Sequence, residues 1–306
     1  MIKDTDGDRY EDTRSMDQAL SFDETAAEFK TRGIEFGPAQ MRTLGLIGDD
    51  GLYTGLGLLL SDQCPHIIKA ATFNGTDPLE FRDRREFGGS ILKQLKDAYE
   101  YIDMRNSNSA SFEGLLRQDR RDYPETALRE ALLNAIVHRD YSFSASTLIS
   151  IYADRIEMIS VGGLIRGIEM DDILQGLSIC RNPKLANVLY RLQLIEAYGT
   201  GMAKIRSAYS QSTSGAVFNA TANTFKVILP KLNTEKTTPV IFRENDDRAE
   251  RITQYIYQHN SITRAEIESL FDVGTATAVR IAKDLTERGI ITVTGKGKKT
   301  KYVIGQ

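Results

Sequence analysis

The sequence has few cysteines and no long apolar run. Only Cys64 and Cys180 occur in 306 residues, which excludes a disulfide-built scaffold and is typical of a reducing compartment. No apolar stretch approaches the roughly 18 residues of a membrane span. The acidic, polar start MIKDTDGDRYEDTR is unlike a signal peptide. We therefore expect a soluble, cytoplasmic protein with no membrane partner.

The phosphate loop of P-loop motors is also missing. No G-x-x-x-x-G-K-[ST] run occurs. The nearest approach has five residues between Gly289 and Gly295, and Lys296 is followed by a further glycine. The sequence thus excludes a P-loop helicase. Its three histidines, none of them in an evident dimerisation helix, argue against a histidine kinase.

The charge balance is slightly acidic. A net charge of −3 and a pI of about 5.8 exclude a chain that coats nucleic acid along its whole surface, so any such contact must be local. The hydrophobic fraction of 41% and the charged fraction of 26% are those of ordinary globular proteins. At this length the chain can bury a substantial core and form two domains.

The segment 123–141, YPETALREALLNAIVHRDY, predicts a buried helix of about four turns, which Pro124 can open. Its polar exceptions, Glu130, Asn134 and His138, follow one another at i, i+4 steps and share one face. Unpartnered polar groups are costly in a core, so the stripe faces either a binding site or other polar side chains. The spacing alone leaves a polar seam and a metal and nucleotide site both open. We interpret His138 as a structural hydrogen-bonding residue rather than a catalytic one.

Several turn and cap signals follow this helix. Residues 147–161 alternate around Asp154 and Arg155, which predicts a two-stranded hairpin ended by Gly162 and Gly163. Asn182 is expected to cap a helix that begins at Pro183. Residues 199–201, GTG, directly precede another helical stretch. Residues 233–247 are polar and aperiodic, and we interpret them as a linker.

Residues 248–306 show the order helix, helix, helix, hairpin of a winged helix-turn-helix. The third helix and the wing carry side chains suited to base edges and phosphates. They are Thr275, Thr277, Arg280, Lys283, Lys296, Lys298, Lys299 and Lys301. A winged helix that serves only as a protein interaction module is the alternative.

Taken together, the chain resembles a family of prokaryotic regulators. These combine a divergent GHKL-type ATPase domain, of the gyrase and histidine-kinase fold, with a winged helix. The runs YPETALREALLNAIVHRDYS, ADRIEMISVGGL, SICRNPKLANVL and EAYGTGMAKI carry the resemblance over about residues 41–306. It implies an α+β protein with a GHKL-like α/β sandwich at 41–232 and a winged helix at 248–306. Full-length members commonly begin with a Schlafen-like, AlbA-type domain. Residues 1–40 are then expected to be an arm left from that domain, and the chain a fragment.

The resemblance also implies roles for individual residues. Glu130 would polarise water as a general base, and Asn134 would hold the Mg²⁺ that bridges the phosphates of ATP. The remaining nucleotide-binding positions lie in the two glycine loops and just ahead of the first. They are Ser160, Gly162, Gly163, Gly199, Thr200 and Gly201. Ser160 stands where the fold usually has an aspartate that reads adenine, and a hydroxyl accepts a hydrogen bond more weakly than a carboxylate.

Three functional hypotheses follow. The first is a regulator that binds double-stranded DNA and uses a nucleotide as a switch. The second is a Mg²⁺-dependent ATPase of GHKL type that acts on nucleic acid. The third is a degenerate scaffold that binds no nucleotide. Because winged helices often read two-fold sites, we also expect a homodimer.

Overall fold

The computed structural model describes residues 9–113, 116–196, 199–212, 214–232, 251–253, 255–256, 261–271, 273–294 and 300–304. The chain forms two compact units, Met1–Glu235 and Lys236–Gln306, which are treated separately below. The expected linker, 233–247, lies outside the described residues.

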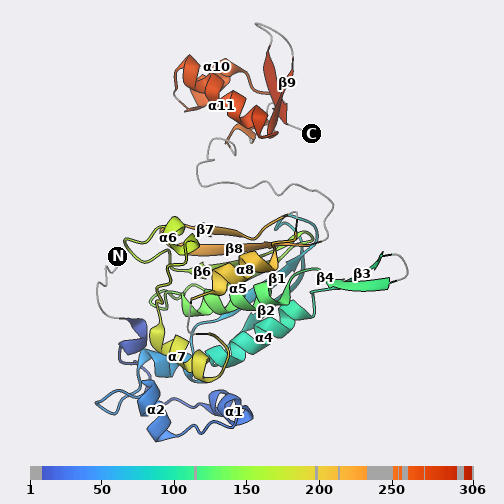
Figure 1. The fold of residues 1–306 in the computed structure, drawn as a ribbon. Helices are drawn as coiled ribbons and strands as arrows, with labels where there is room; N and C mark the ends of the chain where they lie inside the picture. Colours follow the sequence, from blue (N-terminus) through green and yellow to red (C-terminus); the bar gives the residue numbers. More distant parts are fainter. Residues whose placement is uncertain are drawn as a thin grey trace. The chain divides into compact units, whose positions relative to one another are not determined.

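A six-stranded sheet forms the framework of the first unit (Figure 1). Its strands, in spatial order, are β2 (Phe81–Phe87), β1 (Ile68–Phe73), β5 (Thr147–Ile151), β6 (Arg155–Val161), β8 (Thr224–Pro230) and β7 (Val217–Ala220). Neighbours are antiparallel except β1 and β5, which are parallel and therefore require a crossover. The antiparallel pair β5 and β6 confirms the predicted hairpin. The mixed sheet agrees with the expected α+β class.

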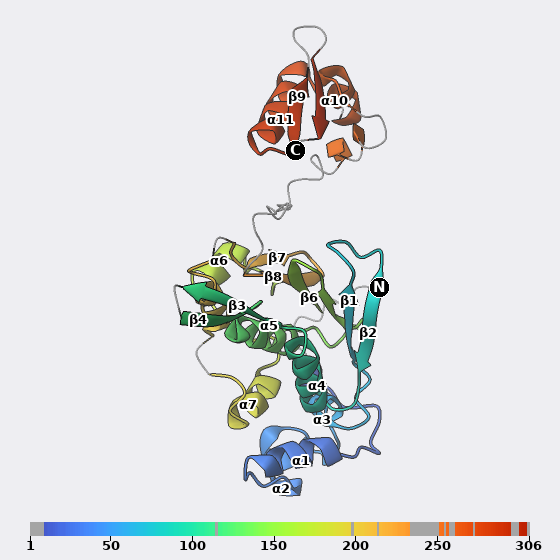
Figure 2. The same ribbon diagram turned by 90° about the vertical axis from the view of Figure 1, so that its right-hand side faces the viewer.

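Helices α4 (Ile91–Asp103), α5 (Glu125–Val137) and α8 (Gly201–Ala208) lie on one face of the sheet (Figures 1 and 2). The central helix of the sequence is α5, and it packs against β6, β8, α4 and α8, as its nearly all-round apolar surface predicts. It is shorter than expected. Pro124 is an extended N-cap rather than a helical residue, and His138 is the C-cap.

Residues 9–40 pack onto the same unit. They contribute a short 3-10 helix η1 (Tyr10–Asp12), α1 (Asp23–Thr31) and the start of α2 (Pro38–Leu44), and α3 (Gly55–Leu60) follows. Phe22 and Phe29 are buried in the common hydrophobic core. Whether this segment is the remnant of another domain stays a prediction.

Asn182 is the N-cap of α7 (Pro183–Arg191) and Pro183 its first helical residue, as expected, but the Asn182 side chain does not supply the capping hydrogen bond. Its amide donates instead to the carbonyls of Val137 and Arg139, each at 2.8 Å, just after α5. Glu11 caps α7, because its carboxylate accepts from the backbone amides of residues 184 and 185. A buried carboxylate is well placed at the positive end of a helix.

Two smaller elements complete this unit. The strands β3 (Asn108–Glu113) and β4 (Leu116–Arg121) pair with each other and not with the main sheet, and they project from the unit (Figure 1). Helix α6 (Met170–Leu174) lies in the segment between β6 and α7. No helix among the described residues is long and apolar enough to cross a membrane.

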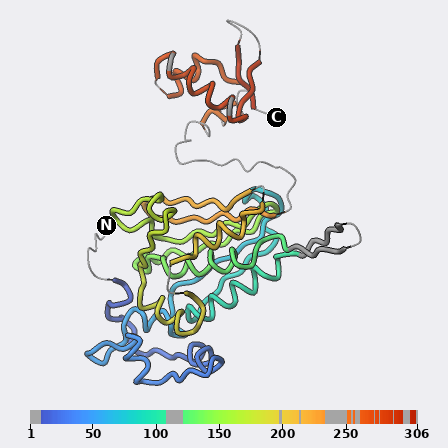
Figure 3. Tube along the Cα trace, in the orientation of Figure 1, coloured from blue at the N-terminus to red at the C-terminus, as the bar shows by residue number. Residues whose placement is uncertain are grey.

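The second unit has its own core. It contains α10 (Arg264–Phe271), α11 (Thr275–Glu287) and an antiparallel hairpin of β9 (Ile291–Thr294) and β10 (Lys301–Ile304). Figure 3 traces its Cα path in red and orange. Ile252 and Ile256, from the first helix expected here, are buried with Ala278, Ala282 and Leu285 of α11. The element order agrees with the sequence pattern, and its identification as a winged helix stays a prediction.

Candidate functional site

Two cavities lie beside the C-terminal half of α5. The first has a volume of about 180 Å³ and lies between α5, α8, the strands β6 to β8 and segment 162–181; we call it the apolar chamber. The second, of about 290 Å³, lies between α5, α7 and α8; we call it the polar chamber. Both are lined by Asn134, His138, Ser178, Gly199 and Gly201. They are therefore adjoining halves of one site.

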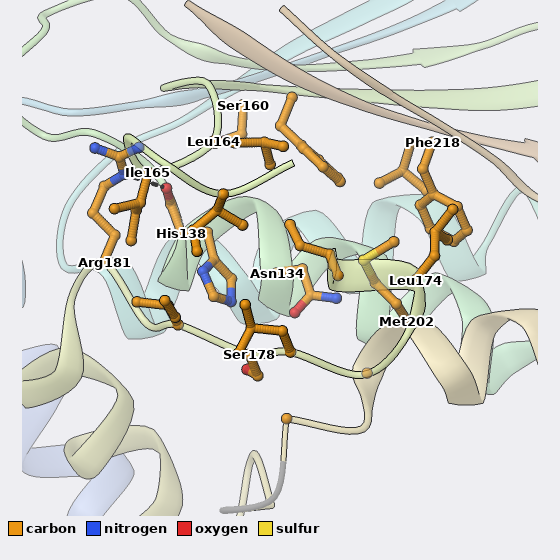
Figure 4. Close-up of a pocket in the computed structure, with 18 of the residues that line it drawn as sticks. Asn134, His138, Ser160, Leu164, Ile165, Leu174, Ser178, Arg181, Met202 and Phe218 are labelled. Atoms are coloured by element: carbon orange, nitrogen blue, oxygen red, sulfur yellow. Dashed lines mark hydrogen bonds between the residues drawn. The ribbon is translucent and has the colours of Figure 1, made fainter. Parts of the chain in front are cut away.

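The walls of the apolar chamber are mainly aliphatic and aromatic. Leu164 and Leu174 come from the segment that follows β6, Met202 from α8, and Phe218 from β7 (Figure 4). Mostly apolar cavities with a few polar groups are typical of small-molecule sites. This chamber therefore suits an apolar group of a small molecule.

Ser160 is the buried polar residue on the sheet side of this chamber. It lies on β6, is only 4% exposed, and its hydroxyl donates to the backbone carbonyl of Ala135 at 2.7 Å. A hydroxyl has one proton and two lone pairs. Because the proton is already used, Ser160 can only accept a hydrogen bond from a ligand.

The first glycine pair, Gly162 and Gly163, also lines the apolar chamber, and backbone packing explains both residues. Gly162 has a φ of +108°, a region that side chains rarely adopt. A Cβ on Gly163 would lie 2.5 Å from the carbonyl oxygen of Ala222 and still closer to that of Thr221. The pair is therefore needed by the fold, whether or not a ligand binds.

The second glycine loop brings the start of α8 onto the polar stripe of α5. A Cβ on Gly201 would lie 3.0 Å from Asn134 Nδ2 and 3.1 Å from Glu130 Oε2. A larger residue here would require the Asn134 and Glu130 side chains to shift by a few tenths of an ångström. Three of the predicted site residues thus meet at one point, beside a helix N-terminus whose first amides have no partner within the helix.

The other two residues of this loop have different surroundings. Gly199 has a φ of +61°, and a Cβ there would lie 2.5 Å from Ser178 Oγ. Thr200 is the N-cap of α8, but its side chain makes no capping hydrogen bond. Its hydroxyl is therefore not committed to the helix, and the residue lines the polar chamber. Both features fit a loop that receives an anion.

Glu130 is 9% exposed and lines the polar chamber. Its Oε1 lies 2.5 Å from Arg129 Nη1 and 4.0 Å from Lys204 Nζ. Arg129 also donates to the carbonyl of Leu194 at 2.6 Å. One carboxylate oxygen is thus committed to a guanidinium, while its other oxygen, Oε2, lies against Gly201. The sequence analysis did not identify Arg129 or Lys204 as site residues. The position of Lys204, three residues after Gly201 at the start of a helix, is the sequence signal that could have identified it.

His138 adjoins both chambers. Burial is the main cause that lowers its pKa, and the positive charge of Arg181 adds to the effect. The ring is therefore neutral at neutral pH. Arg181 donates to the carbonyls of His138 and Gly163, at 3.1 and 2.7 Å, and so ties the end of α5 to the first glycine pair.

No cluster of three or more His, Cys, Asp or Glu that could hold a metal occurs in the described part of the chain. Cys180 lines the polar chamber, and burial raises its pKa to about 11, so it is a neutral thiol at pH 7. A metal at Asn134 would therefore depend on oxygen ligands from a bound phosphate. This donor set fits Mg²⁺, which prefers oxygen ligands and is often bound together with substrate phosphates.

The predicted DNA-contacting residues belong to the second unit. Thr275, Thr277, Arg280 and Lys283 lie on α11, and the side chains of Arg280 and Lys283 are exposed. Lys301 is exposed at the start of β10. Lys296, Lys298 and Lys299 lie outside the described residues.

The chain is similar to one protein family and to solved structures. Residues 145–229 match the family described as "Putative ATP-dependent DNA helicase recG C-terminal", an ATPase-like domain. The match includes both glycine loops and Ser160 but not α5. It covers a minority of the chain and is a similarity only. A search of curated proteins found no match.

Among solved structures, the fold is similar to that of the DIP2311 protein from Corynebacterium diphtheriae, with a TM-score of 0.65 and 19% sequence identity. The alignment covers 98% of this chain and 64% of the other, so the chain spans less than two thirds of that protein. At this identity the likeness concerns the fold alone.

Proposed function

We propose that residues 41–232 bind a nucleoside triphosphate with Mg²⁺, and that this binding acts as a switch on DNA binding by a winged helix at 248–306. The observation that carries the proposal is the pair of adjoining chambers over α5. One is apolar and has a hydroxyl acceptor on its sheet side. The other brings an amide, a carboxylate and a helix N-terminus together.

The two chambers divide the recognition of a nucleotide between them. In the apolar chamber, Ser160 can accept from a ring amino group, as found on adenine, while Leu164 and Phe218 exclude water from the ring. In the polar chamber, the loop 199–201 supplies backbone donors to phosphate. Asn134 would hold Mg²⁺, whose charge offsets that of the phosphates. The match of residues 145–229 to an ATPase-like family supports this assignment.

ATP hydrolysis is a second candidate function. It is favoured by the position of Glu130, which lines the polar chamber next to Asn134. Because Arg129 already engages one of its oxygens, Glu130 would have to use the other to orient water. Binding alone requires no such rearrangement, so it is the primary proposal.

Calorimetric titration of Mg²⁺-ATP into the wild-type protein tests the nucleotide site. We expect saturable binding with one nucleotide per chain, and a changed affinity for DNA when the nucleotide is present. No heat from the wild-type protein would reject the switch and favour the degenerate scaffold.

The DNA-binding proposal depends on α11. Its buried residues Ala278, Ala282 and Leu285 face the unit's own core, which leaves Arg280 and Lys283 on the exposed side. An exposed arginine on a recognition helix suits base edges, whereas lysines in a wing suit phosphates. A two-fold DNA site would be read by a homodimer.

Substitutions in this unit are expected to separate the two kinds of contact. Arg280→Ala should change sequence preference, at a cost of about 1–3 kcal/mol for the base pair that it reads. Joint replacement of Lys296, Lys298 and Lys299 by glutamine should weaken binding to all sequences and lower the salt slope by about one per lysine. Fluorescence anisotropy with a set of duplexes measures both effects. Arg288→Ala, at the far end of α11, is the matched control, and an equal loss on every sequence for Arg280→Ala would contradict base reading.

A further inference from the structure

Lys204 is the single cation among the described residues that line the polar chamber. It lies on the first turn of α8, one turn after Gly201, and its side chain is 29% exposed. The other lining residues named above carry an amide, a carboxylate or neutral groups. A triphosphate in this chamber would therefore meet one positive side chain.

In the structure, acidic side chains surround this lysine. Lys204 Nζ lies 2.7 Å from Glu196 Oε2 and 4.0 Å from Glu130 Oε1. The Glu196 side chain is 62% exposed, so this ion pair is well hydrated. Exposed ion pairs of this kind contribute little to stability. A more highly charged partner can therefore displace Glu196 at little cost.

Glu196 lines the same chamber as Lys204. It lies ahead of the loop 199–201. Lys204 can thus exchange Glu196 for a phosphate without leaving the chamber. On the two sides of this pair, Arg129 donates to the carbonyl of Leu194 and Gly201 lies close to Asn134.

We propose that Lys204 recognises the terminal phosphate of the bound nucleotide and that Glu196 occupies Lys204 when that phosphate is absent. This inference rests on the proposed nucleotide-binding function and adds to it the discrimination between triphosphate and diphosphate. A lysine acts on phosphate as a point charge. The terminal phosphate carries the charge that distinguishes ATP from ADP, so the lysine favours the triphosphate.

The experiment compares a non-hydrolysable ATP analogue with ADP, each with Mg²⁺, by calorimetry. Wild-type protein is expected to bind the ATP analogue at least about 10-fold more tightly than ADP, because the lysine makes a charge-assisted contact with the terminal phosphate. In Lys204→Gln, the ratio of analogue affinity to ADP affinity should fall close to one, while the ADP affinity stays within about two-fold of the wild-type value. Lys204→Arg should restore part of the ratio. Glu196→Gln should tighten analogue binding by about two- to five-fold, because the competing carboxylate is removed.

Lys93→Gln is the matched control, since Lys93 is also a half-exposed helical lysine paired with a carboxylate, Asp97, but lies on α4 away from both chambers. The ratio of its affinities for the ATP analogue and for ADP should equal that of the wild-type protein. An unchanged ratio in Lys204→Gln, with binding intact, would overturn the role of Lys204 and leave the proposed function standing. Absence of any binding to the wild-type protein would overturn both.

Discussion

Replacing Gly163 by alanine is expected to destabilise the first unit by about 1–3 kcal/mol. The new Cβ would lie 2.5 Å from the carbonyl oxygen of Ala222 and nearer to that of Thr221, and both are backbone atoms of the turn between β7 and β8. Backbone cannot swing aside as a flexible side chain can. The turn or the end of β6 must therefore move. Thermal unfolding followed by circular dichroism should show a fall in melting temperature of about 2–10 °C.

Gly215→Ala is the matched control for this prediction. Gly215 lies just before β7, has no left-handed φ, and a Cβ there would meet no atom within 4 Å. Its replacement should leave stability unchanged or raise it by up to about 1 kcal/mol, because alanine restricts the unfolded chain. Equal melting temperatures for Gly163→Ala and the wild-type protein would show that the turn is not packed on Gly163 as described.

Asn134→Ala is expected to weaken binding of Mg²⁺-ATP by about 10- to 100-fold, the cost of removing a contact to a charged group. Asn134 adjoins both chambers and lies directly against Gly201, so it stands between the proposed base site and the proposed phosphate site. Calorimetry gives the affinity. Chelation of Mg²⁺ should weaken ATP binding to the wild-type protein by a similar factor. It should weaken ATP binding to the variant much less, because the variant has already lost the metal contact.

Asn219→Ala serves as the control for this substitution. Phe218 faces the apolar chamber, and successive strand residues point to opposite faces, so the side chain of Asn219 lies on the other face of the sheet. Its removal should leave nucleotide affinity unchanged. If Asn134→Ala bound Mg²⁺-ATP as tightly as this control, Asn134 would not be the metal contact.

The elements that the sequence predicted well are those with strong local patterns. The nearly all-round apolar surface of α5 required burial, and its polar exceptions required a site or partners; the structure places Asn134 beside two cavities. The alternation through residues 147–161 gave the β5 and β6 hairpin. In both cases a single continuous segment is enough for the prediction, because the spacing of its apolar residues is that of a helix or of a strand.

Other features depend on contacts between segments far apart in sequence. The edge strand β2 carries the charged sequence FRDRREF and is mostly exposed, so no alternation of buried residues marks it. Glu11 caps a helix that begins more than 170 residues later, and no local pattern links them. For the same reason the hydrogen bond from Arg129 to the carbonyl of Leu194, 65 residues later, required the folded chain.

The most direct test of the nucleotide site is a crystal structure with a non-hydrolysable ATP analogue and Mg²⁺. The account predicts the base in the apolar chamber with its amino group on Ser160 Oγ, and the phosphates in the polar chamber, with the metal at Asn134 and the loop 199–201 against the phosphate oxygens. A chain that binds no nucleotide under saturating analogue, or that binds it away from these two chambers, would contradict the central claim.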